Sequence, residues 1–147
     1  MDEAAQSLVV HFQELDLPPA AAEWLLDVWQ MIQALDDVAD GDAIERPRLD
    51  GAIWASLVTM PANPFYLTNA QALQAGLALL VLKWQASDDA EREGQADARS
   101  FVWRAGYYDL VLLVVLLTKG HATAMKNAKK VMHLYGETLH EYLKEFS

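Results

Sequence analysis

The sequence predicts an all-α protein, a single-domain antiparallel bundle of five or six helices that covers residues 1–147. Three observations support this fold class. Apolar residues recur at helical spacing along long segments, and no segment alternates strictly between apolar and polar residues. Glycine and proline fall in short clusters between those segments. With 147 residues, of which 53% are hydrophobic, the chain can build one core but is short for two ordinary domains.

The expected helices span residues 3–15, 19–40, 48–59, 67–92, 96–119 and 121–145. Pro19 suits the first turn of the second helix, where its missing N–H costs nothing. Gly41 suits the end of the same helix, because glycine readily adopts the left-handed conformation found there. These two signals bound the second helix.

The later helices carry similar signals. Thr68 or Asn69 is expected to cap the fourth helix and Asp97 the fifth, because their side-chain oxygens accept hydrogen bonds from free first-turn amides. Gly120 is expected to end the fifth helix. Because the links between segments are short, consecutive helices are expected to run antiparallel.

The fifth helix contains the most apolar run of the chain, Leu110 to Leu117, and only Asp109 interrupts the run that starts at Ala105. Such a run covers about 20 Å as a helix, less than the roughly 30 Å of a membrane's hydrocarbon core. We therefore predict a buried central helix. Asp109 is expected to pair with Arg104 or with a lysine of the last helix.

The last helix is predicted to carry an apolar seam at three- and four-residue spacing: Met125, Ala128, Met132, Tyr135, Leu139, Tyr142 and Phe146. Leu79 and Leu82 add apolar surface on the fourth helix, away from its main stripe. This surplus favours a homodimer, although a helix at the centre of a monomer would have the same pattern.

Charge and cysteine content exclude several classes of protein. The formal net charge is −10, so general binding to nucleic acid or to an anionic membrane surface is not expected. The absence of cysteine excludes a disulfide framework, a cysteine zinc site and a cysteine nucleophile. The opening residues Met1-Asp2-Glu3-Ala4-Ala5 do not resemble a signal peptide. A cytoplasmic location is therefore the expectation.

An acidic cluster, Asp36, Asp37, Asp40 and Asp42, lies at the end of the second helix. The apolar stripe of that helix is predicted to be Leu25, Val28, Trp29, Ile32, Leu35 and Ala39. Helical geometry places Asp36 within this stripe and Asp40 at its border, whereas Asp37 points away. A carboxylate on a buried stripe needs a partner, and the helix dipole opposes negative charge at this end.

A second acidic group, Asp88, Asp89 and Glu91, ends the fourth helix. The antiparallel order predicts that both groups meet at one end of the bundle, where their oxygens suit Mg²⁺. The predicted metal ligands are Asp36, Asp40, Asp37, Asp88 and Glu91. The predicted diphosphate-binding residues are Arg99, Arg46 and Arg48. In the alternative interpretation, the carboxylates are simply solvated at helix ends and Asp36 pairs with Arg46 or Arg48.

The segment Asp36-Asp37-Val38-Ala39-Asp40 resembles the first aspartate-rich motif of the trans-isoprenoid synthases, the all-α family of prenyl diphosphate synthases and terpene cyclases. Basic residues follow the motif, and the stretches Asn69–Leu80 and Glu93-Gly94-Gln95 also look similar to family patterns. The resemblance implies a helical bundle whose aspartates bind Mg²⁺ and a diphosphate. A second aspartate-rich motif is missing and Gly76-Leu77 replaces the family's Gly-Asp pair, so full synthase activity is not expected.

Two alternatives remain open, and the sequence does not decide whether the chain is an enzyme. The pairs Asp37-x-x-Asp40 and Asp88-x-x-Glu91 resemble the paired acidic motifs of the all-α nucleoside triphosphate pyrophosphohydrolases of the MazG and dimeric dUTPase type. That resemblance implies Mg²⁺-dependent activation of water on a nucleotide. The other alternative is a non-catalytic interaction or oligomeric structural protein that uses its apolar last helix to bind partners.

Overall fold

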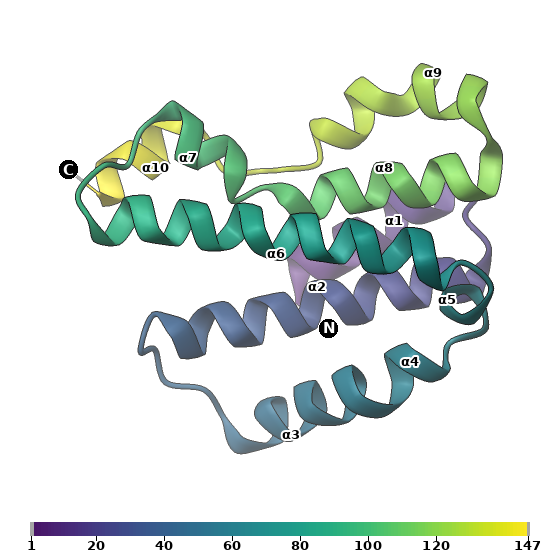
Figure 1. The fold of residues 1–147 in the computed structure, drawn as a ribbon, viewed down its shortest axis with the longest axis horizontal. Helices are drawn as coiled ribbons and strands as arrows, with labels where there is room; N and C mark the ends of the chain where they lie inside the picture. The colour runs from purple at the N-terminus through teal and green to yellow at the C-terminus, as the bar shows by residue number, and fades with distance from the viewer. Residues whose placement is uncertain (1, 147) are drawn as a thin grey trace. The chain divides into compact units, whose positions relative to one another are not determined.

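A computed structural model describes residues 2–146, and within that range every regular element is helical, as the sequence predicts (Figure 1). The chain forms two compact units, Met1–Ala70 and Gln71–Ser147, which we call unit 1 and unit 2. The assignment of residues 1–147 to one domain stays a prediction.

Unit 1 is organised around its longest helix, α2. Its helices are α1 (Glu3–Glu14), α2 (Pro19–Ala39), α3 (Arg46–Trp54), the π-helical turn η1 (Ala55–Thr59), α4 (Met60–Ala62) and α5 (Pro64–Thr68). α2 contacts α1, α3, η1, α4 and α5. The buried apolar side chains come mainly from α1 and α2: Ala5, Leu8, Phe12, Leu15, Leu17, Ala21, Trp24, Leu25, Val28, Ala34 and Met60. The other helices of unit 1 therefore all pack against α2.

The predicted ends of α2 are confirmed. Pro19 occupies its first turn. Gly41 has a φ of 75°, and the amide of Asp42 donates to the carbonyl of Asp37, which closes the helix in a Schellman motif. The same motif ends α1, where Asp16 adopts a φ of 53° in the position usually taken by glycine.

Asn69, one of the two residues predicted to cap the fourth helix, lies directly before the helix at Ala70–Arg92, and its capping role stays a prediction. The short helix α5 has a cap of its own, Asn63, whose Oδ1 accepts from the amides of Phe65 and Tyr66 at 2.8 and 3.1 Å. Its Nδ2 donates to the carbonyl of Ala20 at 2.9 Å, so the same side chain ties α5 to α2. Pro64, directly after this cap, suits the first helical position.

Unit 2 contains α6 (Ala70–Arg92), α7 (Ala98–Trp103), α8 (Gly106–Lys119), α9 (His121–Met132) and α10 (Leu139–Glu145). Its buried apolar side chains are Leu73, Leu80, Tyr107, Leu110, Val111, Val114, Val115, Ala124, Val131 and Tyr142. α8 is the most buried helix, as predicted, and α6 and α8 approach closely at Gly106, where an added Cβ would lie 3.4 Å from the Cα of Leu80. Asp97 caps α7 and Gly120 ends α8, which confirms both predictions.

Three predicted helices are divided in the structure. The segment 48–59 is interrupted by η1, where the hydrogen bonding changes from α to π. The segment 96–119 breaks at Ala105, whose amide donates to the carbonyl of Val102 and so tightens the last turn of α7. The segment 121–145 breaks after Met132, and Thr138 begins α10 by accepting from the amide of Glu141 at 3.2 Å. The predicted continuous seam of the last helix is therefore split between two helices.

Asp109 is paired, but with a different residue than predicted. Its carboxylate is half exposed and forms an ion pair with Lys83 of α6 at 2.5 Å, rather than with Arg104 or with a lysine of the last helices. Within the described residues, none of the helices combines the length and the apolar character that crossing a membrane requires.

Candidate functional site

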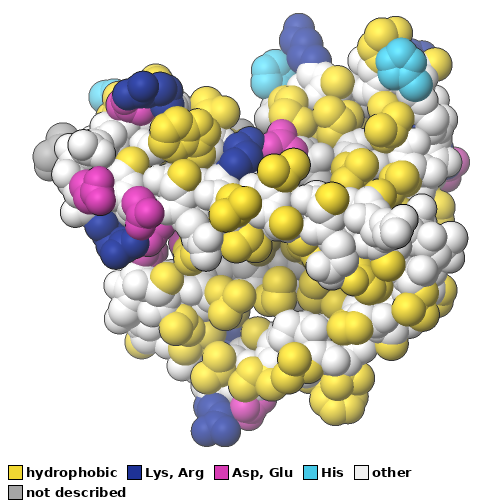
Figure 2. All heavy atoms as spheres, in the orientation of Figure 1, with side chains coloured by type: hydrophobic (Ala, Val, Ile, Leu, Met, Phe, Trp, Pro, Cys, Tyr) yellow, Lys and Arg dark blue, Asp and Glu magenta, His cyan; other side chains and the backbone are white. Residues whose placement is uncertain are grey.

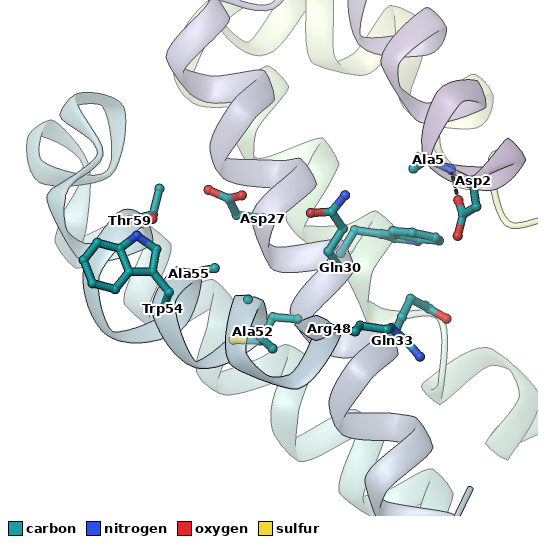
Figure 3. A pocket seen from close by; sticks show the side chains of 13 residues that line it. Asp2, Ala5, Asp27, Gln30, Gln33, Arg48, Ala52, Trp54, Ala55 and Thr59 are labelled. Carbon is teal, nitrogen blue, oxygen red and sulfur yellow. Dashed lines mark hydrogen bonds between the residues drawn. The ribbon is translucent and has the colours of Figure 1, made fainter. Parts of the chain in front are cut away.

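Unit 1 contains a pocket of about 810 Å³ beside α2. Its walls come from α1, α2, α3 and η1, and its lining residues are Asp2, Ala5, Asp27, Trp29, Gln30, Met31, Gln33, Arg48, Gly51, Ala52, Trp54, Ala55 and Thr59. Figure 3 shows the side chains of α2 and of the α3–η1 segment facing the same space. The lining therefore combines carboxylates, amides and two indole rings.

Asp27 is the most unusual group of this pocket. Its carboxylate extends from α2 toward η1, where Ala55 and Thr59 lie (Figure 3). Among residues 2–146 it makes no hydrogen bond or ion pair with another side chain or with the backbone. Burial raises the pKa of the Asp27 carboxyl above its usual value, and the neighbouring carboxylate of Glu23 adds to the rise. The pocket therefore holds a partly buried acid without a counter-ion.

An exposed apolar surface lies next to the pocket. We call it the apolar ridge: Ile53, Trp54, Leu57 and Val58, which are 48%, 63%, 73% and 41% exposed. These positions fall within about 140° of one another around a helix. Neither α3 nor η1 buries any residue. In Figure 2 hydrophobic side chains gather over α3 at the lower edge of the view. The α3–η1 segment thus presents apolar side chains to solvent.

All of the net charge of the chain belongs to unit 1. Residues 1–70 carry twelve acidic and two basic side chains, a charge of −10, whereas residues 71–147 carry nine of each and are neutral. Both basic side chains of unit 1 are paired: Arg46 with Asp50 at 2.9 Å and Arg48 with Asp37 at 2.5 Å. No basic side chain of unit 1 is therefore left for Asp27.

The predicted ligands of the first acidic group lie at the end of α2, but its buried stripe stops earlier than predicted. Ala34 is buried, whereas Leu35 is 49% exposed and Ala39 is exposed. Asp36 is half-buried and Asp40, the residue that follows α2, is exposed. Arg48 forms an ion pair with Asp37, and the pairing of Asp36 with an arginine stays a prediction.

The predicted residues of the second group, in unit 2, are also paired. Asp88 binds Arg92 at 2.9 Å, and Arg99 binds Asp97 at 2.8 Å. Glu91 faces the interior of the unit rather than solvent: its side chain is 15% exposed and accepts from Tyr142 at 2.9 Å. Across the described part of the chain, residues 2–146, no three histidine or carboxylate side chains form a group that could hold a metal ion. The Mg²⁺ site stays a prediction.

Sequence reasoning missed a polar network inside unit 2. Ser87 Oγ donates to the carbonyl of Ser100 at 2.8 Å, and the hydroxyls of Ser100 and Tyr142 lie 2.6 Å apart. The guanidinium of Arg104 lies 5.0 Å from the ring centre of Tyr142 and within 4 Å of the carboxylates of Glu91 and Glu137. The network joins α6, α7 and α10. The only sequence signal is the placement of serines at otherwise buried helix positions.

Electrostatics in this network favour the protonated tyrosines. Burial raises the pKa of Tyr142, the hydrogen bond with Ser100 opposes this rise and the one with Glu91 adds to it. Burial and the hydrogen bond to Glu137 raise the pKa of Tyr135 far above the usual range. Burial alone would lower the pKa of Arg104, but the charges around it, including Glu137 and Glu91, outweigh burial and raise it. The network therefore connects α6, α7 and α10 inside the unit, and Nη1 of Arg104 lies 3.6 Å from Glu91 without a hydrogen bond.

Comparison with protein-family models, curated proteins and solved structures finds no match to this chain.

Proposed function

We propose that the chain is a non-catalytic binding protein whose unit 1 docks a basic amphipathic helix from a partner protein. The apolar ridge carries this proposal, because its four large apolar side chains face solvent on a helical segment that contributes nothing to the core. Exposed contiguous apolar side chains on a charged unit are typical of protein-interaction sites. η1 adds support, since π-helical turns are frequent at functional sites.

The charge of unit 1 selects the kind of partner. A unit with a net charge of −10 attracts a helix rich in lysine or arginine and speeds its association. A second copy that docked ridge to ridge would bring two such units together, and like charges oppose that arrangement. The apolar side chains of the ridge can pack against the apolar face of a partner helix. Amphipathic helices bind through the same face in helix-in-groove complexes.

The test uses the full chain and a labelled amphipathic peptide of leucine and lysine, with binding followed by fluorescence anisotropy. We expect Leu57→Ser to weaken binding by about tenfold, since a buried apolar anchor contributes on the order of 1–3 kcal/mol. Leu67→Ser is the matched control, because Leu67 is 62% exposed on α5, outside the ridge. A scrambled peptide of the same charge and a glutamate version of the peptide separate apolar docking from attraction by charge.

Three outcomes would overturn this proposal. Equal effects of the Leu57 and Leu67 substitutions would show that the ridge is not the contact surface. Equal binding of the scrambled peptide would reduce the interaction to charge alone. Sedimentation equilibrium that shows a dimer of the wild type, dissociated by Leu57→Ser, would assign the ridge to a second copy of the chain.

Exposed apolar side chains of unit 2 support the predicted homodimer, which stays a prediction. Leu79 and Leu82 on α6 are 63% and 62% exposed, and Met125 on α9 is 68% exposed. Sedimentation equilibrium of wild type and Leu82→Ser tests this prediction separately from the ridge. A wild type that sediments as a monomer would contradict the predicted homodimer.

The Mg²⁺ and diphosphate site, whether in a degenerate isoprenoid synthase or in a pyrophosphohydrolase, is also kept as a prediction. It is tested by calorimetric titration of Mg²⁺ with and without pyrophosphate, on wild type and on the double variant Asp36→Asn/Asp40→Asn. Binding that tightens with pyrophosphate and requires both aspartates would support it. If no heat of binding is measured at millimolar Mg²⁺, both enzyme hypotheses are contradicted.

A further inference from the structure

We propose that the pocket of unit 1 binds a methylated ammonium group, with Asp27 as its counter-ion and the indole rings of Trp29 and Trp54 as its walls. This site is separate from docking on the apolar ridge, although Trp54 belongs to both surfaces. The observation that carries it is a carboxylate without a partner in a pocket that two tryptophans line.

The carboxylate supplies the charge that such a ligand needs. Asp27 is only partly exposed, and a carboxylate removed from water without a counter-ion is unfavourable. Arg48, which also lines the pocket, already binds Asp37 at 2.5 Å, and Arg46 binds Asp50. A cation from outside the chain would therefore offset the cost of holding Asp27 in this pocket.

The tryptophans decide which cation fits. The electron-rich face of an indole attracts an organic cation, and recognition of methylated ammonium groups by aromatic rings is the best-known functional use of that attraction. A hard metal ion instead needs six or more oxygen ligands. The pocket offers the carboxylate of Asp27 and that of Asp2, which already accepts from the amide of Ala5 at 2.8 Å. The amides of Gln30 and Gln33 can hydrogen-bond polar parts of the ligand, and the volume of about 810 Å³ lies in the range of small-molecule sites.

The experiment measures binding of choline and of tetramethylammonium to the full chain by calorimetry, with tryptophan fluorescence as a second readout. The neutral control is 3,3-dimethylbutan-1-ol, which has the shape of choline without its charge. We expect choline to bind about tenfold more tightly than this alcohol, and Asp27→Asn to remove most of that difference.

Matched variants separate a specific site from the general acidity of unit 1. Asp42→Asn removes the same charge from an exposed position outside the pocket and is expected to change choline affinity by less than about twofold. Trp29→Leu removes one indole wall but leaves the apolar ridge intact, and it is expected to weaken choline about fivefold. Far-ultraviolet circular dichroism of each variant verifies that the helices are intact.

A methylated ammonium group can belong to a free small molecule or to a trimethyl-lysine side chain. A peptide that carries trimethyl-lysine separates these sources, and the same peptide with unmodified lysine is its control. Tighter binding of the trimethyl-lysine peptide than of choline assigns the site to protein recognition, and the reverse assigns it to a free small molecule. Equal binding of choline and its neutral analogue, equal effects of Asp27→Asn and Asp42→Asn, or no binding at about 10 mM choline overturns the proposal.

Discussion

The hydroxyl of Tyr142 donates a hydrogen bond of 2.9 Å to Oε2 of Glu91, a residue 51 positions earlier in the chain. Tyr142 is completely buried and Glu91 nearly so, and this bond connects α10 to α6. α10 has only seven residues, too few for an isolated helix to be stable in water. The attachment of the C-terminal helix therefore depends on this buried contact and on the rings packed around it.

The variant Tyr142→Phe is expected to lower the free energy of unfolding by about 1–3 kcal/mol, because it removes the two hydrogen bonds that this buried hydroxyl makes with Glu91 and Ser100. Urea denaturation followed by circular dichroism measures the change. Tyr108→Phe is the control: its hydroxyl makes no hydrogen bond with any described residue, and a change below about 0.5 kcal/mol is expected. Equal effects of the two substitutions would contradict the role given to the Tyr142 hydroxyl.

Unfolding at alkaline pH is expected to involve the tyrosines of unit 2. Burial raises the pKa values of Tyr107, Tyr108, Tyr135 and Tyr142 above 10, and the hydrogen bond to Glu137 raises that of Tyr135 further. Stability that depends on protonated phenols is fully present below about pH 10, the value in the unfolded chain, and is lost as the pH rises through the raised folded values.

The measurement is the urea midpoint as a function of pH, for wild type and for Tyr135→Phe. We expect a fall in the wild-type midpoint above about pH 10 and a smaller fall in the variant, which has one tyrosine fewer to ionise on unfolding. Parallel curves for the two proteins would contradict this assignment. Tyrosinate absorbance recorded on the same samples shows when the phenols ionise.

Helix ends could be predicted where the signal is local. Pro19 and Gly41 bound α2, and Asp97 caps α7 through hydrogen bonds to residues two and three positions away. Each of these depends on backbone geometry within one turn, so the residue type alone carries the information. The all-α fold class follows in the same way from the spacing of apolar residues.

Contacts between distant residues could not be predicted. Ser100 and Tyr142 are 42 positions apart, and nothing in the residues near either one indicates the other. The extent of the buried stripe of α2 could not be predicted for a related reason, whereas the candidate metal site stays a prediction. Periodicity alone predicts a stripe that reaches Leu35, but burial depends on which neighbours cover the helix, and Leu35 is half exposed. Asp27 gave one usable signal, a carboxylate beside Leu26 and Val28 on the buried half of α2.

The ion pair between Lys83 and Asp109 is expected to contribute little to stability. The side chains are 34% and 54% exposed, and exposed pairs contribute about 0–1 kcal/mol because water and salt screen them. Asp109→Asn should therefore lower the free energy of unfolding by less than about 1 kcal/mol, and the difference should shrink in about 1 M salt. A larger loss that is independent of salt would mean that Asp109 has a buried role.

The turn between α8 and α9 is expected to require glycine at position 120. Gly120 has φ of 87° and ψ of 175°, a region that is essentially closed to residues with a Cβ. Its amide donates to the carbonyl of Leu116 and its carbonyl accepts from Ala124, so the turn cannot relax without disturbing both helices. Gly120→Ala should destabilise the chain by about 1–3 kcal/mol.

Gly136→Ala is the control, since Gly136 has open space around it and no positive φ. Its effect on the free energy of unfolding should be within about 0.5 kcal/mol of zero or stabilising. Urea denaturation of both variants tests the prediction, and a Gly120 variant as stable as the Gly136 variant would show that the turn adopts another conformation.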